Sequence, residues 1–386
     1  MNYGQESFSN NTIAMTIKNT KSLLPFYHGS TENNANDGFP ELLPFSVFFD
    51  EELKMFRMLP DSEVSMWLKK VYDSGSLVDG SISNESGSFY IDPIVNYIEN
   101  VIYSNKDLAL LEVGTGKGVI LNELRKRGYE NLYGIEPSPY NYEDLEKGII
   151  FMQGYFPDTK PNVELDIIMH FAVWEHVDDP LFFIKKQFDC LSSDGKIIFG
   201  VPNCEPTILA GDLSMFIHEH YSYFTRESIQ EIVRMTNGGI ESLEVIGGMI
   251  VGVISKTGMA MDHTNQFKCI GEIEFWRKVE GMKTALAGLI NSHNFQSNVA
   301  IYVPGRALNV LYQLGFSEVR LVDDNSEIHG KYLPFFKNTV ESFSELIANP
   351  PKVIVVFSNT FGEKIRLKCL NDIRLNDTEV LIYSEL

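Results

Sequence analysis

A glycine-rich turn that follows an apolar run constrains the fold of this chain more than any other feature. The run Leu110-Leu111-Glu112-Val113 leads into glycines at positions 114, 116 and 118, and residues 119–124 then have helical spacing. Glycine lets the backbone turn tightly and leaves room for a ligand against the loop. A second apolar run, Tyr133-Gly134-Ile135-Glu136, ends about 20 residues after the glycines in an acid suited to accept hydrogen bonds from ribose hydroxyls. The two segments predict the first two strands of a nucleotide-binding sheet.

Short apolar runs and helical patterns alternate through the rest of the chain. We predict helices at 92–104 and 118–127, strands at 108–113, 132–136, 148–152, 165–170 and 196–201, and a closing hairpin over 241–255. Such alternation is typical of a mainly parallel, doubly wound α/β sheet with helices on both faces. A helical stretch over 267–293 precedes a second α/β unit, with strands predicted at 299–303, 319–322, 353–357 and 380–383 and a helix at 307–314.

The N-terminal region lacks this alternation. Residues 9–38 are rich in Asn, Thr, Ser and Gly, so we expect no regular structure there. Residues 39–90 are too irregular for a strand-helix repeat and too apolar to be solvated, which predicts a small packed module. The expected organisation is therefore an N-terminal module (1–90), a ligand-binding α/β domain (91–256), a helical connector (257–296) and a Rossmann-like C-terminal domain (297–386).

Composition excludes several classes of partner and location. Lys and Arg number 32 against 52 Asp and Glu, a net charge of −20 that repels the phosphates of DNA and RNA. No secretory signal and no run of roughly 20 apolar residues is present, so we expect a cytoplasmic protein without a membrane span. The four cysteines are far apart, which argues against a disulfide framework or a cysteine zinc site. Nothing in the sequence indicates the oligomeric state.

The segment 216–225 gathers titratable groups in His218-Glu219-His220, followed by Tyr221 to Phe224. His176 lies in an earlier loop, and both segments follow strands whose carboxyl ends should face the ligand, so we expect them to converge. Histidine titrates near neutral pH, which suits it to remove a proton from a hydroxyl or an acidic C–H. We therefore predict His220, oriented by Glu219, as a base. The alternative interpretation makes 218–224 a lid in which Tyr223 and Phe224 fill a groove.

The pattern acid-x-Gly-x-Gly-x-Gly resembles the first motif of class I S-adenosylmethionine-dependent methyltransferases rather than the Gly-x-Gly-x-x-Gly of dinucleotide sites. The resemblance implies that Glu136 holds the adenosine ribose, that the loop at 153–157 borders the adenine, and that residues 170–172 contact the methionine end. The implied cofactor residues are Glu112, Gly114, Thr115, Gly116, Gly118, Glu136, Gln153, His170 and Ala172. Two alternatives remain: a glycine turn in another kind of α/β protein, and a His170 that is only a core histidine bonded to backbone.

Other segments carry a more specific resemblance, to the bacterial sugar C-methyltransferase family. These are His176 in Glu-His-Val-Asp-Asp-Pro, residues 218–224, Val-Asp-Asp-Asn at 322–325 and His-Gly-Lys-Tyr-Leu-Pro at 329–334. That family joins a zinc-binding N-terminal module, a class I methyltransferase domain and a Rossmann-like C-terminal domain, and acts on nucleotide-linked keto-sugars. The resemblance implies His220 as the base, Glu219 and His176 as its assistants, and Tyr72 as a further catalytic residue that reaches the substrate. Gly305 and Arg306, at the start of a predicted helix, are expected to contact the nucleotide's phosphates. His218 and Tyr223 are further candidates for substrate contacts.

The chain departs from that family in two ways. The N-terminal region lacks the four zinc-binding cysteines, and Ile217 replaces a tyrosine whose phenol could stabilise an enolate. Carbon methylation needs that enolate, whereas oxygen methylation needs only a base or a metal. We therefore predict an O-methyltransferase that acts on a nucleotide-activated sugar in surface (capsular or lipopolysaccharide) polysaccharide biosynthesis and releases S-adenosylhomocysteine. The alternatives are a C-methyltransferase on a nucleotide-linked keto-sugar and a noncatalytic nucleotide-binding protein.

A divalent metal ion is a further alternative for the acceptor site. Carboxylates and imidazoles ligate several such ions, which in turn bind sugar diols. The candidate ligands are Glu175, His176, Asp178, Glu219 and His220. Because their convergence is not given by the sequence, a metal-free site is the favoured interpretation.

Overall fold

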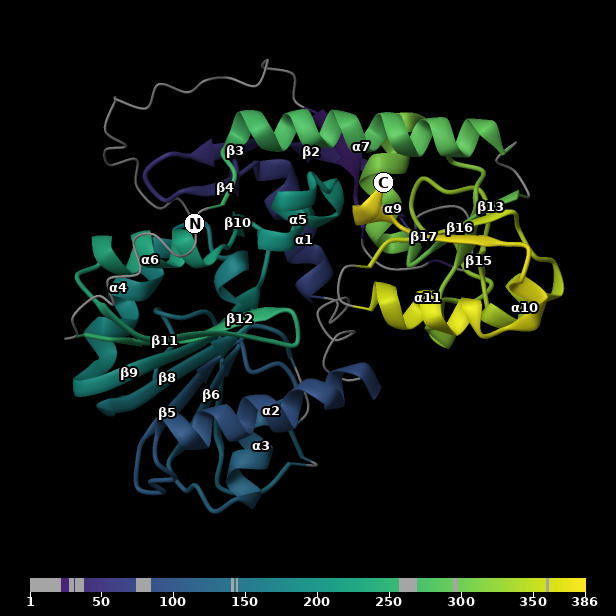
Figure 1. Ribbon diagram of the computed structural model, residues 1–386. Coiled ribbons are helices and arrows are strands. Elements are labelled where there is room, and N and C mark those ends of the chain that lie inside the picture. Colours follow the sequence, from purple (N-terminus) through teal and green to yellow (C-terminus); the bar gives the residue numbers. More distant parts are fainter. Residues whose placement is uncertain are drawn as a thin grey trace.

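A seven-stranded sheet lies at the centre of the structure, a computed structural model that describes residues 22–27, 31, 38–73, 85–139, 142–143, 145–256, 269–293, 298–358 and 361–386. The strand order is β11-β12-β9-β8-β5-β6-β7 (Figure 1). Its parallel strands are β5 (Leu110–Val113), β6 (Leu132–Glu136), β7 (Ile150–Gln153), β8 (Leu165–Phe171) and β9 (Leu191–Pro202). The order reverses between β5 and β8, so the loops after these strands flank the crevice in which such sheets bind ligands. The predicted doubly wound α/β fold is confirmed.

A hairpin closes this sheet as predicted. β12 (Met249–Ser255) pairs antiparallel with β9, and β11 (Gly239–Ile246) pairs antiparallel with β12. The turn between the hairpin strands is Gly247-Gly248, and both glycines have positive φ. Because glycine reaches this backbone region without steric cost, the two residues allow the tight reversal.

Helices cover both faces of the sheet. α2 (Glu85–Val101) and α3 (Val119–Lys126) pack on one face, and α4 (Pro180–Cys190) and α6 (Arg226–Met235) pack on the other. α2 begins seven residues before the predicted start at 92, because the helix continues through Pro93. Proline favours the first helical turn and usually breaks helix interiors, so a helix that continues through Pro93 is not expected from local sequence.

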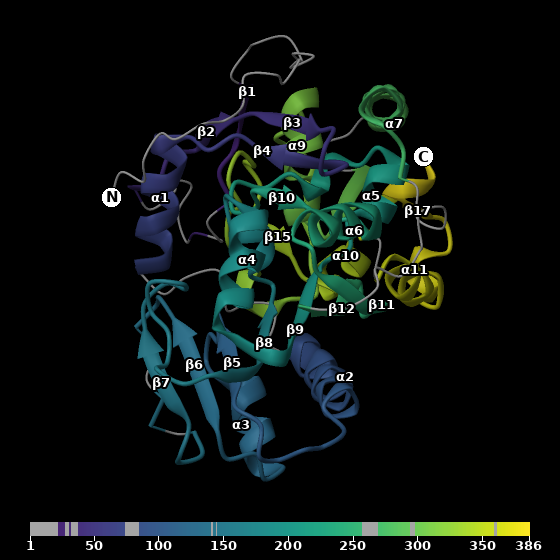
Figure 2. The ribbon, with the colours of Figure 1, turned by 90° about the vertical axis from the view of Figure 1, so that its left-hand side faces the viewer.

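The N-terminal part forms two small sheets and a helix above the central sheet (Figure 2). β1 (Ser22–Pro25) pairs antiparallel with β2 (Leu42–Phe45), so the expectation of no regular structure over 9–38 is wrong at β1. Its partner is contributed by a distant segment, which local composition does not reveal. The second sheet has the order β10-β4-β3, from β3 (Val47–Asp50), β4 (Met55–Met58) and β10 (Ser222–Tyr223), and helix α1 (Ser62–Asp73) follows it. The segment after β9 therefore supplies one strand of the module.

The C-terminal part is a five-stranded parallel sheet in the order β15-β14-β13-β16-β17. Its strands are β13 (Val299–Tyr302), β14 (Arg320–Val322), β15 (Val340–Glu341), β16 (Val353–Val356) and β17 (Glu379–Ile382). Its helices are α9 (Pro304–Leu314), α10 (Phe343–Ala348) and α11 (Gly362–Leu370). The order reverses between β13 and β16, so the start of α9 lies beside the switch point of a Rossmann-like sheet. The sequence analysis missed β15, which is only two residues long.

One long helix, α7 (Glu272–Ser292), joins the N-terminal and C-terminal parts (Figure 1). Phe275 and Val279 in its first half are buried in the core of the N-terminal module. Leu286 and Ile290 in its second half are buried in the C-terminal core. A single amphipathic helix thus packs into two hydrophobic cores. Among the described helices, none is long and apolar enough to cross a membrane.

Replacing Leu286 by Ala should destabilise the C-terminal part, because the side chain is 0% exposed and its loss leaves a cavity. We expect a loss of about 2–5 kcal/mol and a lower midpoint of thermal unfolding by circular dichroism. Ile273 on the same helix is 78% exposed, so Ile273→Ala should change stability by less than about 0.5 kcal/mol. Equal effects of the two substitutions would contradict the packing described for α7.

Candidate active site

The glycine loop between β5 and α3 needs glycine at two positions for steric reasons. Gly114, Gly116 and Gly118 have φ angles of 70°, 51° and 74°, which other residues rarely adopt. A Cβ atom on Gly114 would lie 2.4 Å from Cγ2 of Val173, and one on Gly118 would lie 2.7 Å from Cδ1 of Leu145. A Cβ on Gly116 would meet no described atom within 4 Å. The middle of the loop therefore faces open space, where a ligand can approach.

Glu136 is fixed at the carboxyl end of β6 against this loop. Its Oε2 accepts a hydrogen bond from the Gly116 N–H at 2.9 Å, and its Oε1 accepts one from the Ser138 N–H at 2.9 Å. Beside it lies a cavity of about 150 Å³, lined by Glu136, Ser138, Pro139, Tyr142, Phe151, Met152 and Gln153. A carboxylate next to apolar and aromatic walls suits the ribose and adenine of an adenosine.

Two aromatic side chains form one wall of this cavity, which the sequence analysis did not foresee. The rings of Tyr142 and Phe151 stack with centroids 3.9 Å apart and planes inclined by 2°. The Tyr142 hydroxyl donates to the Gly116 carbonyl at 3.0 Å. Gln153, which was predicted, lines the same cavity and donates from its side chain to the Pro137 carbonyl.

Glu112 and Thr115 brace the loop from inside. Both are buried, and the Thr115 hydroxyl donates to Oε2 of Glu112 at 3.1 Å. Burial raises the pKa of Glu112 to about 8, opposed by the Thr115 hydrogen bond. In the described part of the chain, neither Glu112 nor Glu136 forms an ion pair with a basic side chain. Unpaired carboxylates around the loop fit S-adenosylmethionine, which carries a sulfonium and an ammonium group.

His170 and Ala172 lie at the end of β8. The His170 ring is 0% exposed and packs against Trp174, Phe183 and Phe199, and burial lowers its pKa to about 3. Neither ring nitrogen has a hydrogen-bond partner among the described residues. His170 thus lies in the core below the loop, where it lacks the backbone partner that the core interpretation expected. Ala172 has a positive φ of 54° and donates its N–H to the Gly200 carbonyl.

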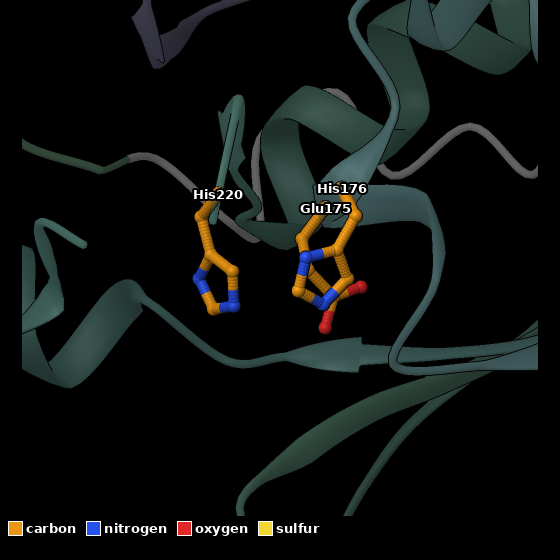
Figure 3. Close-up of side chains that lie close together, drawn as sticks. All are labelled: Glu175, His176 and His220. Carbon is orange, nitrogen blue, oxygen red and sulfur yellow. The ribbon is translucent and has the colours of Figure 1, made fainter. Parts of the chain in front are cut away.

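Three of the candidate acceptor residues, Glu175, His176 and His220, form one cluster (Figure 3). Glu175 and His176 belong to the short helix η3 (Trp174–His176) after β8, and His220 lies in the turn before β10. One potential ligand atom from each residue lies within 4.8 Å of those of the other two. The imidazole centroids of His176 and His220 are 4.9 Å apart, with planes inclined by 80°.

Two hydrogen bonds hold the halves of the cluster together. The Tyr221 N–H donates to the Glu175 carbonyl at 2.7 Å. His176 Nδ1 lies 2.9 Å from the Glu219 carbonyl oxygen. Because a carbonyl oxygen only accepts, the neutral His176 ring carries its proton on Nδ1, and Nε2 is its unprotonated nitrogen. Glu219 therefore positions His176 through its backbone.

Burial determines the charge states of the cluster. It raises the pKa of Glu175 to about 8 and lowers that of His176 to about 4. Burial, and then the positive charges of His176 and Arg306, lower the pKa of His220 well below its ordinary value. Burial also raises the pKa of Glu219 to about 7. At neutral pH both imidazoles are therefore uncharged, with lone pairs available to a proton or to a cation.

The remaining candidates lie outside the cluster. Asp178 accepts a hydrogen bond from Arg57 on its backbone carbonyl, and its carboxylate is not one of the grouped ligands.

The predicted substrate residues His218 and Tyr223 are packed inside the protein. His218 Nε2 lies 3.3 Å from the Leu43 carbonyl, and its ring packs edge-on against Phe26 and Phe45. The Tyr223 hydroxyl donates to the Ile217 carbonyl. His218 and Tyr223 thus pack between the N-terminal module and the central domain, and the side chain of Tyr72 lies outside the described residues.

The C-terminal part contributes the start of α9 to this region. The Asn309 amide donates to the carbonyls of Leu213 and Phe216, which anchors α9 beside the chain leading to His220. Arg306, in the first turn of α9, is exposed, and its charge acts on the pKa of His220. Gly305 precedes it, so a free cationic side chain and a helix N-terminus lie together near the cluster.

Tyr27 of the N-terminal module completes this junction, and the sequence analysis missed it. A Cβ atom on Gly305 would lie 3.9 Å from the Tyr27 ring. Burial, then the negative charges of Asp323 and Glu219, raise the pKa of the Tyr27 phenol. The site therefore has contributions from all three parts of the chain. No sequence signal pointed to Tyr27, which lies in the segment rich in small polar residues.

Comparisons with known proteins show what the central domain is similar to. Residues 90–238 match the family model for a methyltransferase domain. Similar solved structures include 1,6-didemethyltoxoflavin-N1-methyltransferase from Burkholderia thailandensis, with 11% sequence identity and a TM-score of 0.41 over 55% of this chain and 98% of that one. An S-adenosylmethionine-dependent methyltransferase from Mesorhizobium loti has 11% identity and a TM-score of 0.34, over 42% and 99% of the two chains. Magnesium protoporphyrin IX methyltransferase from Synechocystis has 14% identity and a TM-score of 0.32, over 44% and 78%. No curated protein matches the chain.

Replacing Gly114 by Ala should weaken cofactor binding, because the added methyl group meets Val173 and the positive φ is strained. We expect calorimetry to show at least a tenfold loss of affinity for S-adenosylhomocysteine, or about 1.4 kcal/mol. Gly281→Ala on α7 is a matched control, since nothing lies within 4 Å of its added Cβ. Unchanged affinity in the Gly114→Ala variant would show that this loop does not hold the cofactor.

Proposed function

We propose that residues 90–238, which match the model of a methyltransferase domain, bind S-adenosylmethionine in the manner of a class I methyltransferase, and that the chain methylates a hydroxyl of a nucleotide-linked sugar. The products are the sugar methyl ether and S-adenosylhomocysteine. The donor is bound by the glycine loop and Glu136, and the acceptor lies between the cluster of Glu175, His176 and His220 and the start of α9.

The observation that carries this proposal is the position of Arg306. Its guanidinium belongs to the Rossmann-like C-terminal part, yet its charge acts on His220 in the methyltransferase domain. Arginine and the N–H groups of a helix N-terminus both favour phosphate. An acceptor with an anionic end at α9 and a hydroxyl near His220 matches this arrangement. A sugar joined to a nucleoside diphosphate has both features.

The chemistry divides between the donor and the residues of the cluster. S-adenosylmethionine supplies a methyl group on a positively charged sulfur, which an oxygen lone pair can attack. The acceptor oxygen forms a bond to the methyl carbon as the carbon–sulfur bond breaks, and that electron pair remains on sulfur. The hydroxyl must lose its proton during this transfer. The unprotonated imidazole of His220 activates it, and the Glu219 carbonyl holds His176 in place beside His220.

Oxygen is the better-supported acceptor atom. Carbon methylation requires stabilisation of an enolate, and residue 217 is an isoleucine instead of a phenol. The nearby Tyr223 hydroxyl is buried and donates to the Ile217 carbonyl, so it is already engaged. Methylation at carbon of a nucleotide-linked keto-sugar is the alternative outcome.

We assign the reaction to surface (capsular or lipopolysaccharide) polysaccharide biosynthesis in the cytoplasm, because nucleotide-linked sugars are the activated precursors of such polymers. A net charge of −20 supports a small anionic acceptor held by local cations over a nucleic acid, whose many phosphates the protein would repel.

A panel of nucleotide sugars tests the proposal directly. The chain is incubated with S-adenosylmethionine and each candidate, and the products are analysed by mass spectrometry and NMR. We expect one nucleotide sugar to gain the mass of one CH₂ and to show a methoxy signal. A methyl signal on carbon would establish the alternative acceptor atom, and no product from any nucleotide sugar would contradict the proposed substrate class.

Arg306→Ala should weaken acceptor binding without affecting the donor, because the residue contacts only the anionic end of the acceptor. We expect at least a tenfold increase in KM for the nucleotide sugar, or about 1.4 kcal/mol, with unchanged affinity for S-adenosylhomocysteine. Lys364→Ala removes another exposed cation of the C-terminal part and should change neither quantity. Equal KM values in wild type and Arg306→Ala would argue against a phosphate at α9.

A further inference from the structure

Glu175 is a buried acid with one carboxyl oxygen that has no partner among the described residues. Glu175 is 1% exposed, and its Oε2 accepts no hydrogen bond from any described residue. No lysine or arginine in the described part of the chain forms an ion pair with it. Burying a carboxylate without a partner is costly, so such groups usually pair with a cation or bind a metal.

His176 is oriented in the way that metal ligands usually are. Its Nδ1–H donates to the Glu219 carbonyl, which fixes the ring and makes Nε2 the unprotonated nitrogen. Histidines that bind metals generally donate their second ring N–H to a carbonyl or carboxylate in this manner. This backbone hydrogen bond is independent of the unpaired state of Glu175.

The spacing of the three side chains leaves room for an ion. The carboxylate of Glu175 and one nitrogen each from His176 and His220 lie within 4.8 Å of one another. The contacts between these described residues include neither a hydrogen bond nor an ion pair from Glu175 to the imidazoles. An ion held at about 2.1 Å by each ligand needs them roughly 3–4 Å apart. The three side chains therefore need to approach one another by less than about one ångström to bind an ion. Figure 3 shows the carboxylate close to the His176 ring with His220 alongside.

We propose that Glu175, His176 and His220 bind one divalent transition-metal ion. Two imidazole nitrogens and one carboxylate suit Zn²⁺, Co²⁺, Fe²⁺ or Mn²⁺ better than Mg²⁺ or Ca²⁺, which prefer oxygen ligands. Asp178 and the Glu219 carboxylate are not part of the ligand set. Three protein ligands leave coordination positions open for oxygen atoms of a substrate.

The role of the ion in catalysis rests on the function proposed above, whereas its binding does not. An acceptor hydroxyl on an open position would lose its proton to solvent more readily, because a bound cation stabilises the resulting oxygen anion. That oxygen then forms its bond to the methyl carbon as the carbon–sulfur bond breaks. With the ion bound, His220 would activate the hydroxyl through the ion as its ligand instead of accepting the proton itself, and Arg306 would still bind the anionic end of the acceptor.

Metal binding to the full chain tests the proposal. The protein is treated with chelator, dialysed and titrated with Co²⁺ and Zn²⁺ by calorimetry, with the visible absorption of Co²⁺ as a second signal. We expect one equivalent to bind, and we expect Glu175→Gln and His220→Ala each to lose at least tenfold in affinity. His293→Ala, at the end of α7, is the control and should bind as wild type does. Binding of S-adenosylhomocysteine by each variant establishes that it is folded.

The outcomes distinguish failure of the metal site from failure of the proposed function. No binding by wild type, or equal binding and equal Co²⁺ spectra in wild type, Glu175→Gln and His220→Ala, would overturn the metal site. Full turnover of a nucleotide sugar by chelator-treated protein that binds no ion would leave the function intact and reject the ion. Specific ion binding without turnover of any nucleotide sugar would retain the site and reject the proposed acceptor.

Discussion

The proposed acceptor site depends on hydrogen bonds that join the segment around Tyr221 to its neighbours on both sides. The Tyr221 N–H donates to the Glu175 carbonyl, and the Tyr221 carbonyl accepts from the Met58 N–H in β4. The same segment continues into β10, the edge strand of the N-terminal sheet. Backbone hydrogen bonds thus connect the N-terminal module, the turn that contains His220, and η3. Any displacement of the module would separate His220 from Glu175.

This dependence explains why the parts of the chain share cores. The side chains of His218 and Tyr223 fill the space between the N-terminal module and the central domain, and α7 continues the same core into the C-terminal part. The two residues were predicted to contact substrate, and the structure gives them packing contacts on either side of the cluster. Their contribution is to fix the turn that holds Glu219 and His220.

The sequence allowed prediction of everything that depends on local pattern. Apolar runs and glycines predicted the strands of the central sheet but not their order, and the rule that strand ends meet at one edge predicted that His176 and His220 converge. Which acid accompanies them was not predictable. Glu219 adjoins His220 in sequence but contributes its carbonyl, whereas the turn of η3 brings the Glu175 carboxylate to the imidazoles. β1 and Tyr27 escaped prediction because their neighbours are supplied by distant segments.

The charges around the cluster link acceptor binding to ion binding. Arg306 lowers the pKa of His220, so its positive charge also opposes a cation held by that imidazole. A phosphate on Arg306 would offset this repulsion, while its negative charge would oppose the ionisation of Glu175 and Glu219, whose pKa values burial raises to about 8 and about 7. Conversely, a cation at the cluster would offset the repulsion between these acids and an anionic acceptor. In a protein with a net charge of −20, the local balance of charge at this junction, rather than the total, would therefore set the affinity for the proposed anionic acceptor.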